Sequence, residues 1–310
     1  MHSHPASLDF DYVGYGLQIR SALRLPGFVE GEQGGLPEIQ ILREEVAPER
    51  WQAFNDDAQH IVGRAEGLMR FEVEAGERMV IDPVEDGDMD YIRAIVSGEL
   101  MATLLRQRGM LALHGSCVAK DGYAVGFIGH SGWGKSTLAM HFVQHGYRLL
   151  CDDVLAVSFD EPEPAAVPGY PQVKLRRDSG DRFIEGSEYE TLPTAHTETD
   201  KRLYVCDDQF QDVAVPLRKI YILEGQPRPS NQIVNMPQQH AFVELLRHTR
   251  ATNLLKSPEM AQAQLRQLTT LFETIPVSLL QRRWSLDLLP ELYAAIEEDM
   301  QQISYSATGM

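Results

Sequence analysis

The chain has 310 residues, and its hydrophobic content of 43% is enough to build one large domain or two. A formal net charge of −17 argues against a nucleic-acid or anionic membrane partner, because both are bound mainly through clustered Lys and Arg. The chain also lacks a membrane-spanning apolar run, a secretion signal and cysteines with metal-ligand spacing. These features predict a cytoplasmic protein without disulfides or structural zinc.

The first ninety residues contain short stretches in which polar and apolar residues alternate. Examples are residues 17–19, 39–42 and 69–73, and glycine-containing turns separate such stretches. Alternation of this kind is typical of strands with one face on a core and the other in water. The sequence therefore predicts a small, mostly β N-terminal domain over residues 1–90, whose role no motif discloses.

Residues 91–310 are predicted to form a nucleotide-binding domain. Helical spacing over residues 89–108 leads into two apolar stretches, 110–119 and 123–128, which an Asp-Gly turn joins. A hairpin at this place gives the second stretch an antiparallel neighbour. An ordinary doubly wound sheet lacks such a neighbour, because its strands are joined by helical crossovers.

A phosphate-binding sequence of the form G-x-x-x-x-G-K-S follows the second apolar stretch directly, and a helical pattern follows it in turn. In such a loop the backbone N–H groups surround the phosphates, the lysine binds the outer phosphates and the hydroxyl helps to hold Mg²⁺. The residues predicted to bind the nucleotide are Gly129, His130, Ser131, Gly132, Trp133, Gly134, Lys135, Ser136 and Thr137.

Two adjacent carboxylates, Asp152 and Asp153, interrupt the next apolar stretch. A site for Mg²⁺ and a nucleotide needs a carboxylate beside the phosphate loop. Neighbouring residues of a strand point in opposite directions, so one aspartate is expected to face the metal and the other the substrate. The guanine-binding motif of GTPase switches and the signature motif of ABC-type ATPases are both absent from the sequence.

These motifs together resemble the nucleotide core of HPr kinase/phosphorylases and, more distantly, of phosphoenolpyruvate carboxykinases. The resemblance rests on His114-Gly115, on the loop from Gly129 to Ser136 and on the aspartate pair, in this order. It covers about residues 110–177. It implies an α/β fold with a mixed sheet, in which a P-loop kinase core follows the N-terminal domain.

The resemblance also implies a role for each matching residue. Lys135 and the loop backbone would hold the phosphates of ATP, while Ser136 and Asp153 would hold Mg²⁺. Asp152 would act as the general base toward the acceptor hydroxyl. His114 would lie near the transferring phosphoryl group, although a structural, hydrogen-bonded histidine stays open as the alternative.

Residues 169–175, 200–202 and 244–248 resemble stand-alone HPr-kinase-like proteins of ribosomal peptide biosynthesis, including the lasso-peptide kinases that phosphorylate a serine hydroxyl. The glycine-rich second motif of HPr kinases is missing from the chain. Lys201 and Arg202 are expected to neutralise phosphoryl charge in the transition state, with a solvated basic pair as the alternative.

The leading hypothesis is an ATP- and Mg²⁺-dependent kinase that phosphorylates a hydroxyl, namely a serine of a peptide or protein such as a lasso-type precursor. One alternative is a kinase of free serine or another small molecule. Another is a regulator that binds ATP without turnover, but a regulator does not need the second aspartate as a base. Assembly into a homo-oligomer stays open.

Overall fold

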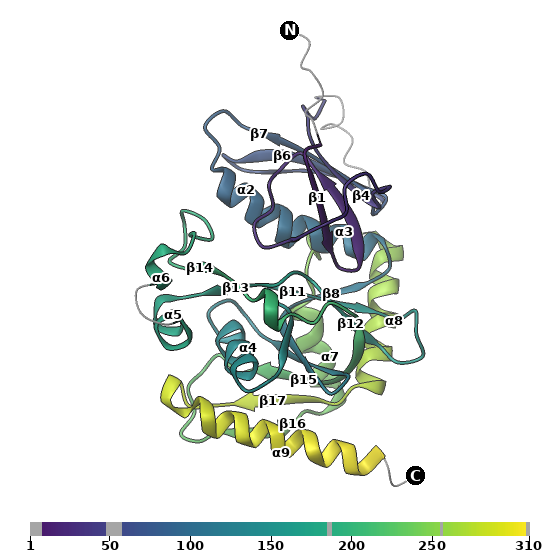
Figure 1. The fold of residues 1–310 in the computed structure, drawn as a ribbon. Helices are drawn as coiled ribbons and strands as arrows, with labels where there is room; N and C mark the ends of the chain where they lie inside the picture. Colours follow the sequence, from purple (N-terminus) through teal and green to yellow (C-terminus); the bar gives the residue numbers. More distant parts are fainter. Residues whose placement is uncertain (1–7, 48–57, 185–187, 255–256, 308–310) are drawn as a thin grey trace.

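The computed structural model describes residues 8–47, 58–184, 188–254 and 257–307. Two sheets are stacked with helices between them: the N-terminal sheet lies above α2 and α3, and the second sheet lies below (Figure 1). In the described part of the chain, no helix combines the length and the apolar character that crossing a bilayer requires.

Over the residues that the structure describes, the N-terminal sheet has seven strands in the order β3-β1-β2-β4-β7-β6-β5. Three of them, β2, β4 and β6, confirm the predicted strands. Along β2, buried residues alternate with more exposed ones, as expected for a sheet with one face in water. The strands are β1 Phe10–Gly14, β2 Leu17–Ser21, β3 Val29–Glu30, β4 Ile39–Arg43, β5 His60–Ala65, β6 Met69–Glu74 and β7 Arg78–Pro83.

The helix predicted over residues 89–108 is confirmed, but it contains a π-helical segment between α2 Met89–Ile95 and α3 Met101–Gln107. Its fully buried row of Ile92, Val96, Leu100 and Leu104 has a four-residue spacing. In an α-helix this spacing drifts by about 40° at each step, and the wider π turn reduces the drift. The π segment, η1 Val96–Leu100, thus keeps the row on one face.

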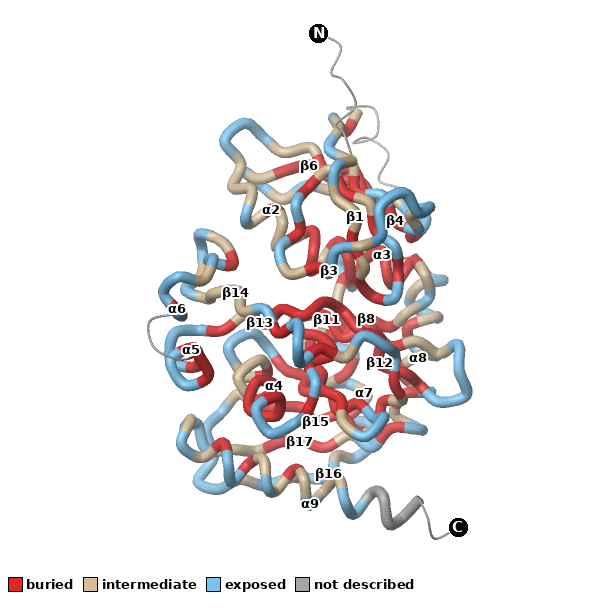
Figure 2. The backbone as a smooth tube through the Cα atoms, viewed as in Figure 1, coloured by how far each residue is buried: buried red, intermediate tan, exposed pale blue. Residues whose placement is uncertain are grey.

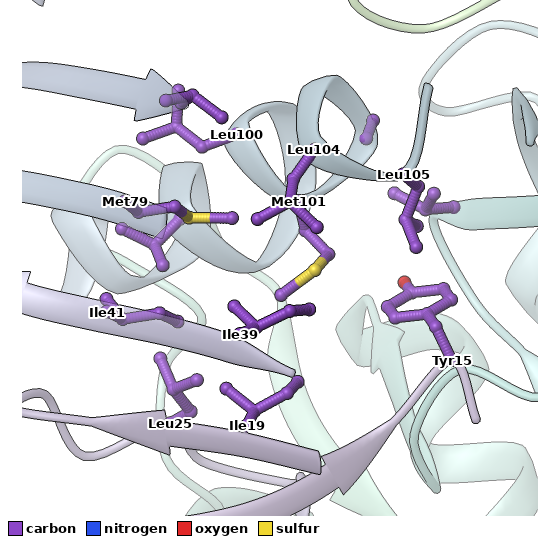
Figure 3. Close-up of a cluster of buried hydrophobic side chains, with 14 of the residues drawn as sticks. Tyr15, Ile19, Leu25, Ile39, Ile41, Met79, Leu100, Met101, Leu104 and Leu105 are labelled. Carbon is purple, nitrogen blue, oxygen red and sulfur yellow. The ribbon is translucent and has the colours of Figure 1, made fainter. Parts of the chain in front are cut away.

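This row packs on the N-terminal sheet. Figure 3 shows Leu100, Met101 and Leu104 pointing toward side chains of the sheet strands. Because the helix after residue 90 shares its core with the sheet before it, the boundary between residues 90 and 91 stays a prediction. The strand residues labelled in this cluster are Ile19, Ile39, Ile41 and Met79, and Tyr15 joins them from the turn between β1 and β2.

The second sheet is mixed, as predicted, so the fold class is α/β with a mixed sheet. β8 Leu111–Lys120 and β9 Tyr123–Ile128 form the expected antiparallel hairpin, and both turn residues, Asp121 and Gly122, have positive φ. On its other side β9 pairs in parallel with β15 Val215–Leu223. The strand that leads into the phosphate loop therefore has one antiparallel and one parallel neighbour.

The two aspartates lie between two strands that both pair with β8. β10 Arg148–Cys151 pairs with one part of β8, and β11 Val154–Ser158 pairs with another. Asp153 has a φ of 78°, which is the left-handed region. The expectation that the pleat of a continuous strand separates the two carboxylates is wrong, because the strand has ended at the pair and a bend takes its place.

The remaining elements surround the second sheet, whose strands and central helix are largely buried (Figure 2). α4 Lys135–Gln144 packs against β8, β10, β13 and α9. Ser257 caps α8, as its sequence predicts. The other elements are β12 Ala165–Val167, β13 Gln172–Leu175, α5 Arg177–Phe183, α6 Glu188–Thr191, β14 Arg202–Val205, η2 Asp207–Gln209, β16 Gln232–Asn235, α7 Gln238–Arg247, α8 Pro258–Thr274, β17 Val277–Gln281, η3 Leu286–Leu288 and α9 Leu289–Ala307.

A buried histidine on α4 predicts a pH dependence of stability. Burial, assisted by the neighbouring His145, lowers the pKa of His141 from 6.5 to about 4. Between these two pH values the unfolded chain binds more protons than the folded one, so the free energy of unfolding should fall as the pH falls from 6.5 toward 4. His141→Leu should remove this part of the pH dependence in urea titrations at a series of pH values.

The exposed His240 supplies the control. His240→Leu should leave the pH profile of the free energy of unfolding as it is in the unmodified protein. Parallel profiles for the unmodified protein and His141→Leu would contradict the assignment of the acid-sensitive component to His141.

Candidate active site

The phosphate loop connects β9 to α4 and turns through two left-handed glycines. Gly132 has a φ of 82° and Gly134, which caps α4, a φ of 80°, a region that other residues rarely adopt. Ser131 to Thr137 line a cleft of about 900 Å³. The strand–loop–helix context that the motif requires is therefore present, and the N-terminus of α4 faces the cleft.

Lys135 is buried at the end of this loop and contacts His114. Its Nζ donates to Nε2 of His114 at 2.9 Å and to the backbone oxygen of His130 at 3.0 Å. A lysine only donates, so Nε2 is the acceptor and the neutral ring carries its hydrogen on Nδ1, which lies 3.2 Å from Oδ1 of Asp153. Burial lowers the pKa of both His114 and Lys135, the latter to about 8.

Asp152 belongs to the phosphate-loop side of the cleft. Its carboxylate accepts hydrogen bonds from Oγ of Ser136 at 2.8 Å, from Oγ of Ser116 at 2.5 Å and from the backbone N–H of Lys174 at 3.0 Å. The side chain is only 5% exposed. Three donors thus fix the carboxylate beside the loop hydroxyl.

Ser136 and Asp152 form an all-oxygen donor set, which suits the hard cation Mg²⁺. Among the residues that the structure describes, no group of three or more His, Cys, Asp or Glu side chains could hold a metal ion. A Mg²⁺ ion at these two residues would take its other ligands from phosphate and water, as this ion commonly does.

Asp153 belongs to a different cluster of side chains. It pairs with Nζ of Lys174 at 2.9 Å and with the guanidinium of Arg250, and it faces His114. Burial by itself would raise the pKa of Asp153, but Lys174, Arg250 and His114 hold that pKa well below its ordinary range. Asp153 is therefore an ionised carboxylate at neutral pH.

The structure brings five predicted side chains together but leaves Arg202 apart, and Gly129 and His130 of the predicted loop are not among the described residues that line the cleft. Arg202 donates to the backbone oxygen of Leu192 at 2.7 Å and lies 3.6 Å from Glu190. Its sequence neighbour Lys201, which was predicted together with it, does line the cleft, whereas Arg202 is not among the described lining residues. The five that meet are His114, Lys135, Ser136, Asp152 and Asp153.

Two of the basic residues in the site were not predicted from the sequence. Lys174 stands between apolar residues in a short strand, and this alternation was a usable signal for a charged residue facing a cleft. Arg250 follows α7, and nothing in its sequence surroundings distinguishes it from a surface arginine. Only the packing of distant segments places it on Asp153.

The N-terminal unit closes one side of the cleft. A Cβ atom added at Gly98 in η1 would lie 3.4 Å from Oδ2 of Asp153, so this helix passes close to the carboxylate. Tyr91 of α2 stacks on His196 with a centroid distance of 4.3 Å, and Oγ1 of Thr197 donates to Asp88 at 2.5 Å. The loop before β14 is thereby attached to the N-terminal helix.

Comparisons with known proteins leave the family open. No protein-family model and no curated protein matches the chain. Among solved structures, an HPr(Ser) kinase/phosphatase from Coxiella burnetii aligns with 64% of this chain and 96% of its own, at 13% sequence identity and a TM-score of 0.33. A score this low does not establish a common fold.

The hydrogen bond from Ser116 to Asp152 gives a prediction about the free energy of unfolding. Ser116→Ala should lower the free energy of unfolding by about 2 kcal/mol, because it removes a buried bond to an ionisable acceptor. Ser278 is equally buried, at 0% exposure, but donates to the neutral Asn235 over 3.3 Å. Ser278→Ala should cost about 1 kcal/mol or less in the same urea titration. A larger loss for Ser278→Ala would contradict this ranking.

Proposed function

We propose that this chain is an ATP- and Mg²⁺-dependent kinase that transfers the γ-phosphoryl group to a hydroxyl, with a serine of a peptide or protein as the acceptor. The division of the two adjacent aspartates carries this proposal. Asp152 is bonded to Ser136 of the phosphate loop, whereas Asp153 is held by Lys174 and Arg250 in the same cleft. Nucleotide binding needs the first carboxylate, and phosphoryl transfer to a hydroxyl needs the second.

The proposal reverses the roles that the resemblance implies for the two aspartates. Asp152 and Ser136 would hold Mg²⁺, and Asp153 would receive the proton of the acceptor hydroxyl. The support for the reversal is the hydrogen bond from Ser136 to Asp152. The hydroxyl of Ser136 is expected to bind the metal ion, so the carboxylate beside that hydroxyl is the one placed to bind the same ion. When bound, Mg²⁺ would neutralise phosphate charge.

Three side chains of the cleft, Asp153, Lys135 and His114, then have a part in the transfer. The bond from the γ-phosphorus to its bridging oxygen breaks, the new bond to the acceptor oxygen forms, and Asp153 takes the acceptor's proton. A carboxylate with a lowered pKa is a weak base, so it orients the hydroxyl first and takes the proton as the new bond forms. Lys135 stabilises charge on the phosphates, and neutral His114 positions Lys135 against Asp153.

The direct test is incubation of the full-length protein with labelled ATP and with serine-containing peptides or free serine, followed by mass spectrometry of the acceptor. Phosphate on peptide serine supports the proposal. Phosphate on free serine alone would make the chain a small-molecule kinase. ATP binding without ADP formation, for any acceptor, would favour the non-catalytic regulator.

Lys135 gives a prediction about turnover. Lys135→Ala removes a buried cation from the phosphates and should lower the transfer rate by at least about a hundredfold. Circular dichroism should show that the variant folds, because this lysine serves the ligand. Near-normal phosphoryl transfer by a folded Lys135→Ala protein would rule out the assignment of the phosphate loop.

The two aspartates give a prediction that separates binding from transfer. Asp152→Asn should weaken binding of ATP in the presence of Mg²⁺ more than in its absence, because an amide is a poorer ligand for this cation. Asp153→Asn should keep ATP affinity within a few-fold while transfer falls by about a hundredfold. Calorimetric affinities and transfer rates measured on both variants give the comparison. The opposite pattern would restore the roles that the resemblance implies.

A further inference from the structure

The two ends of the cleft differ in chemistry. One end is charged and holds Lys135 together with the two aspartates and their cationic partners. The other end lies beyond the start of α4 and is formed by the segment that follows β17. Its lining residues include Asn231, Arg282, Trp284, Leu286 and Leu289.

The direction of the phosphate loop sets the direction of a bound nucleotide. If Lys135 and Asp153 mark the transferring phosphate, the ribose and base must leave the loop at the opposite end. Arg282 borders the turn of the loop, because a Cβ added at Gly134 would be 3.5 Å from its Nη2 and because its guanidinium donates to the backbone oxygen of Trp133. The segment after β17 therefore starts beside the loop, and residues 282–286 continue the lining of the cleft from there.

Within the described part of the chain, the guanidinium of Arg282 has no carboxylate partner. Its buried Nε has no hydrogen-bond partner among the described residues. Burial lowers the pKa of Arg282 to about 10, which still leaves it protonated at neutral pH. A half-buried guanidinium of this kind gains most from a phosphate oxygen, to which it can donate in its fork geometry.

Trp284 adds a flat apolar surface two residues further along the chain. Its side chain is 49% exposed although indole is largely apolar, and it lines the cleft. The guanidinium carbon of Arg282 lies 5.6 Å from the ring centroid. A planar base stacks well on an indole, and Ser285 and Asn231 add polar groups to the same end of the cleft.

We propose that Trp284 stacks on the purine base of the bound nucleotide and that Arg282 binds the phosphate nearest the ribose. This inference rests on the proposed function, since it names the base subsite of the same nucleotide site. It makes the segment between β17 and α9 the part of the chain that distinguishes a nucleotide from a bare polyphosphate.

The test compares ATP with inorganic tripolyphosphate, which shares the phosphate chain but has no base. Calorimetry with Mg²⁺ on the full chain should show that Trp284→Ala binds ATP about tenfold or more weakly, the scale of losing one base–aromatic stack. The affinity of the same variant for tripolyphosphate should be unchanged. Trp284→Phe, which keeps an aromatic face, should stay within a few-fold for both ligands.

Tyr123→Ala supplies a matched control. Tyr123 is an aromatic residue with 42% exposure that stands outside the described lining of the cleft, so its removal should change neither affinity. A second readout is tryptophan fluorescence. In the unmodified protein, ATP should change the fluorescence more than tripolyphosphate does, because only ATP places a base on Trp284. In Trp284→Phe the two ligands should change the fluorescence equally.

The outcomes separate the two proposals. Unchanged ATP affinity in Trp284→Ala, or an equal loss for ATP and tripolyphosphate, would overturn the base subsite while leaving the kinase assignment in place. Failure of the unmodified protein to bind either ligand would overturn the proposed function itself. A selective loss of ATP affinity supports the base subsite, and the assay with labelled ATP decides separately whether the bound nucleotide is a phosphoryl donor.

Discussion

One left-handed residue, Asp153, determines how charge is arranged in the cleft. The strands before and after the aspartate pair both hydrogen-bond to β8, so the bend between them has little freedom to move. A non-glycine residue in this region costs about 1–3 kcal/mol, although aspartate tolerates it better than most residues do. The ion pairs of Asp153 with Lys174 and Arg250 help to offset that cost. The same bend allows Asp152 to stay on the phosphate loop.

The buried charges couple the N-terminal unit to the cleft. Arg250 bridges Asp153 and Glu99 of η1, and Arg106 of α3 donates to the backbone oxygen of Arg250 at 3.0 Å. Gly98 lets the helix approach Asp153 without a side chain between them. A charge that leaves water needs such partners, and removing one of them leaves another charge uncompensated. The N-terminal sheet therefore supports the site through the helix that packs on it.

The elements of the fold follow closely from local patterns in the sequence. Alternation predicts β2, β4 and β6, the Asp-Gly turn predicts the β8–β9 hairpin, and Ser257 marks the start of α8. Each of these signals acts between residues near in the chain, through side-chain direction, turn conformation or capping. The π-helical segment η1 is not predicted by such local signals, because it depends on how the helix packs against the sheet.

The sequence by itself determined the glycine-rich loop with its strand and helix, and the presence of His114 and two aspartates beside it, because each depends on a motif or on a short spacing. Only the tertiary structure decided which aspartate meets Ser136, that Arg202 lies apart and that Arg250 and Trp284 line the cleft. Arg250 and Asp153 are far apart in sequence. Contacts of this kind arise when buried charges find partners during the packing of distant segments, and local residue patterns do not record them.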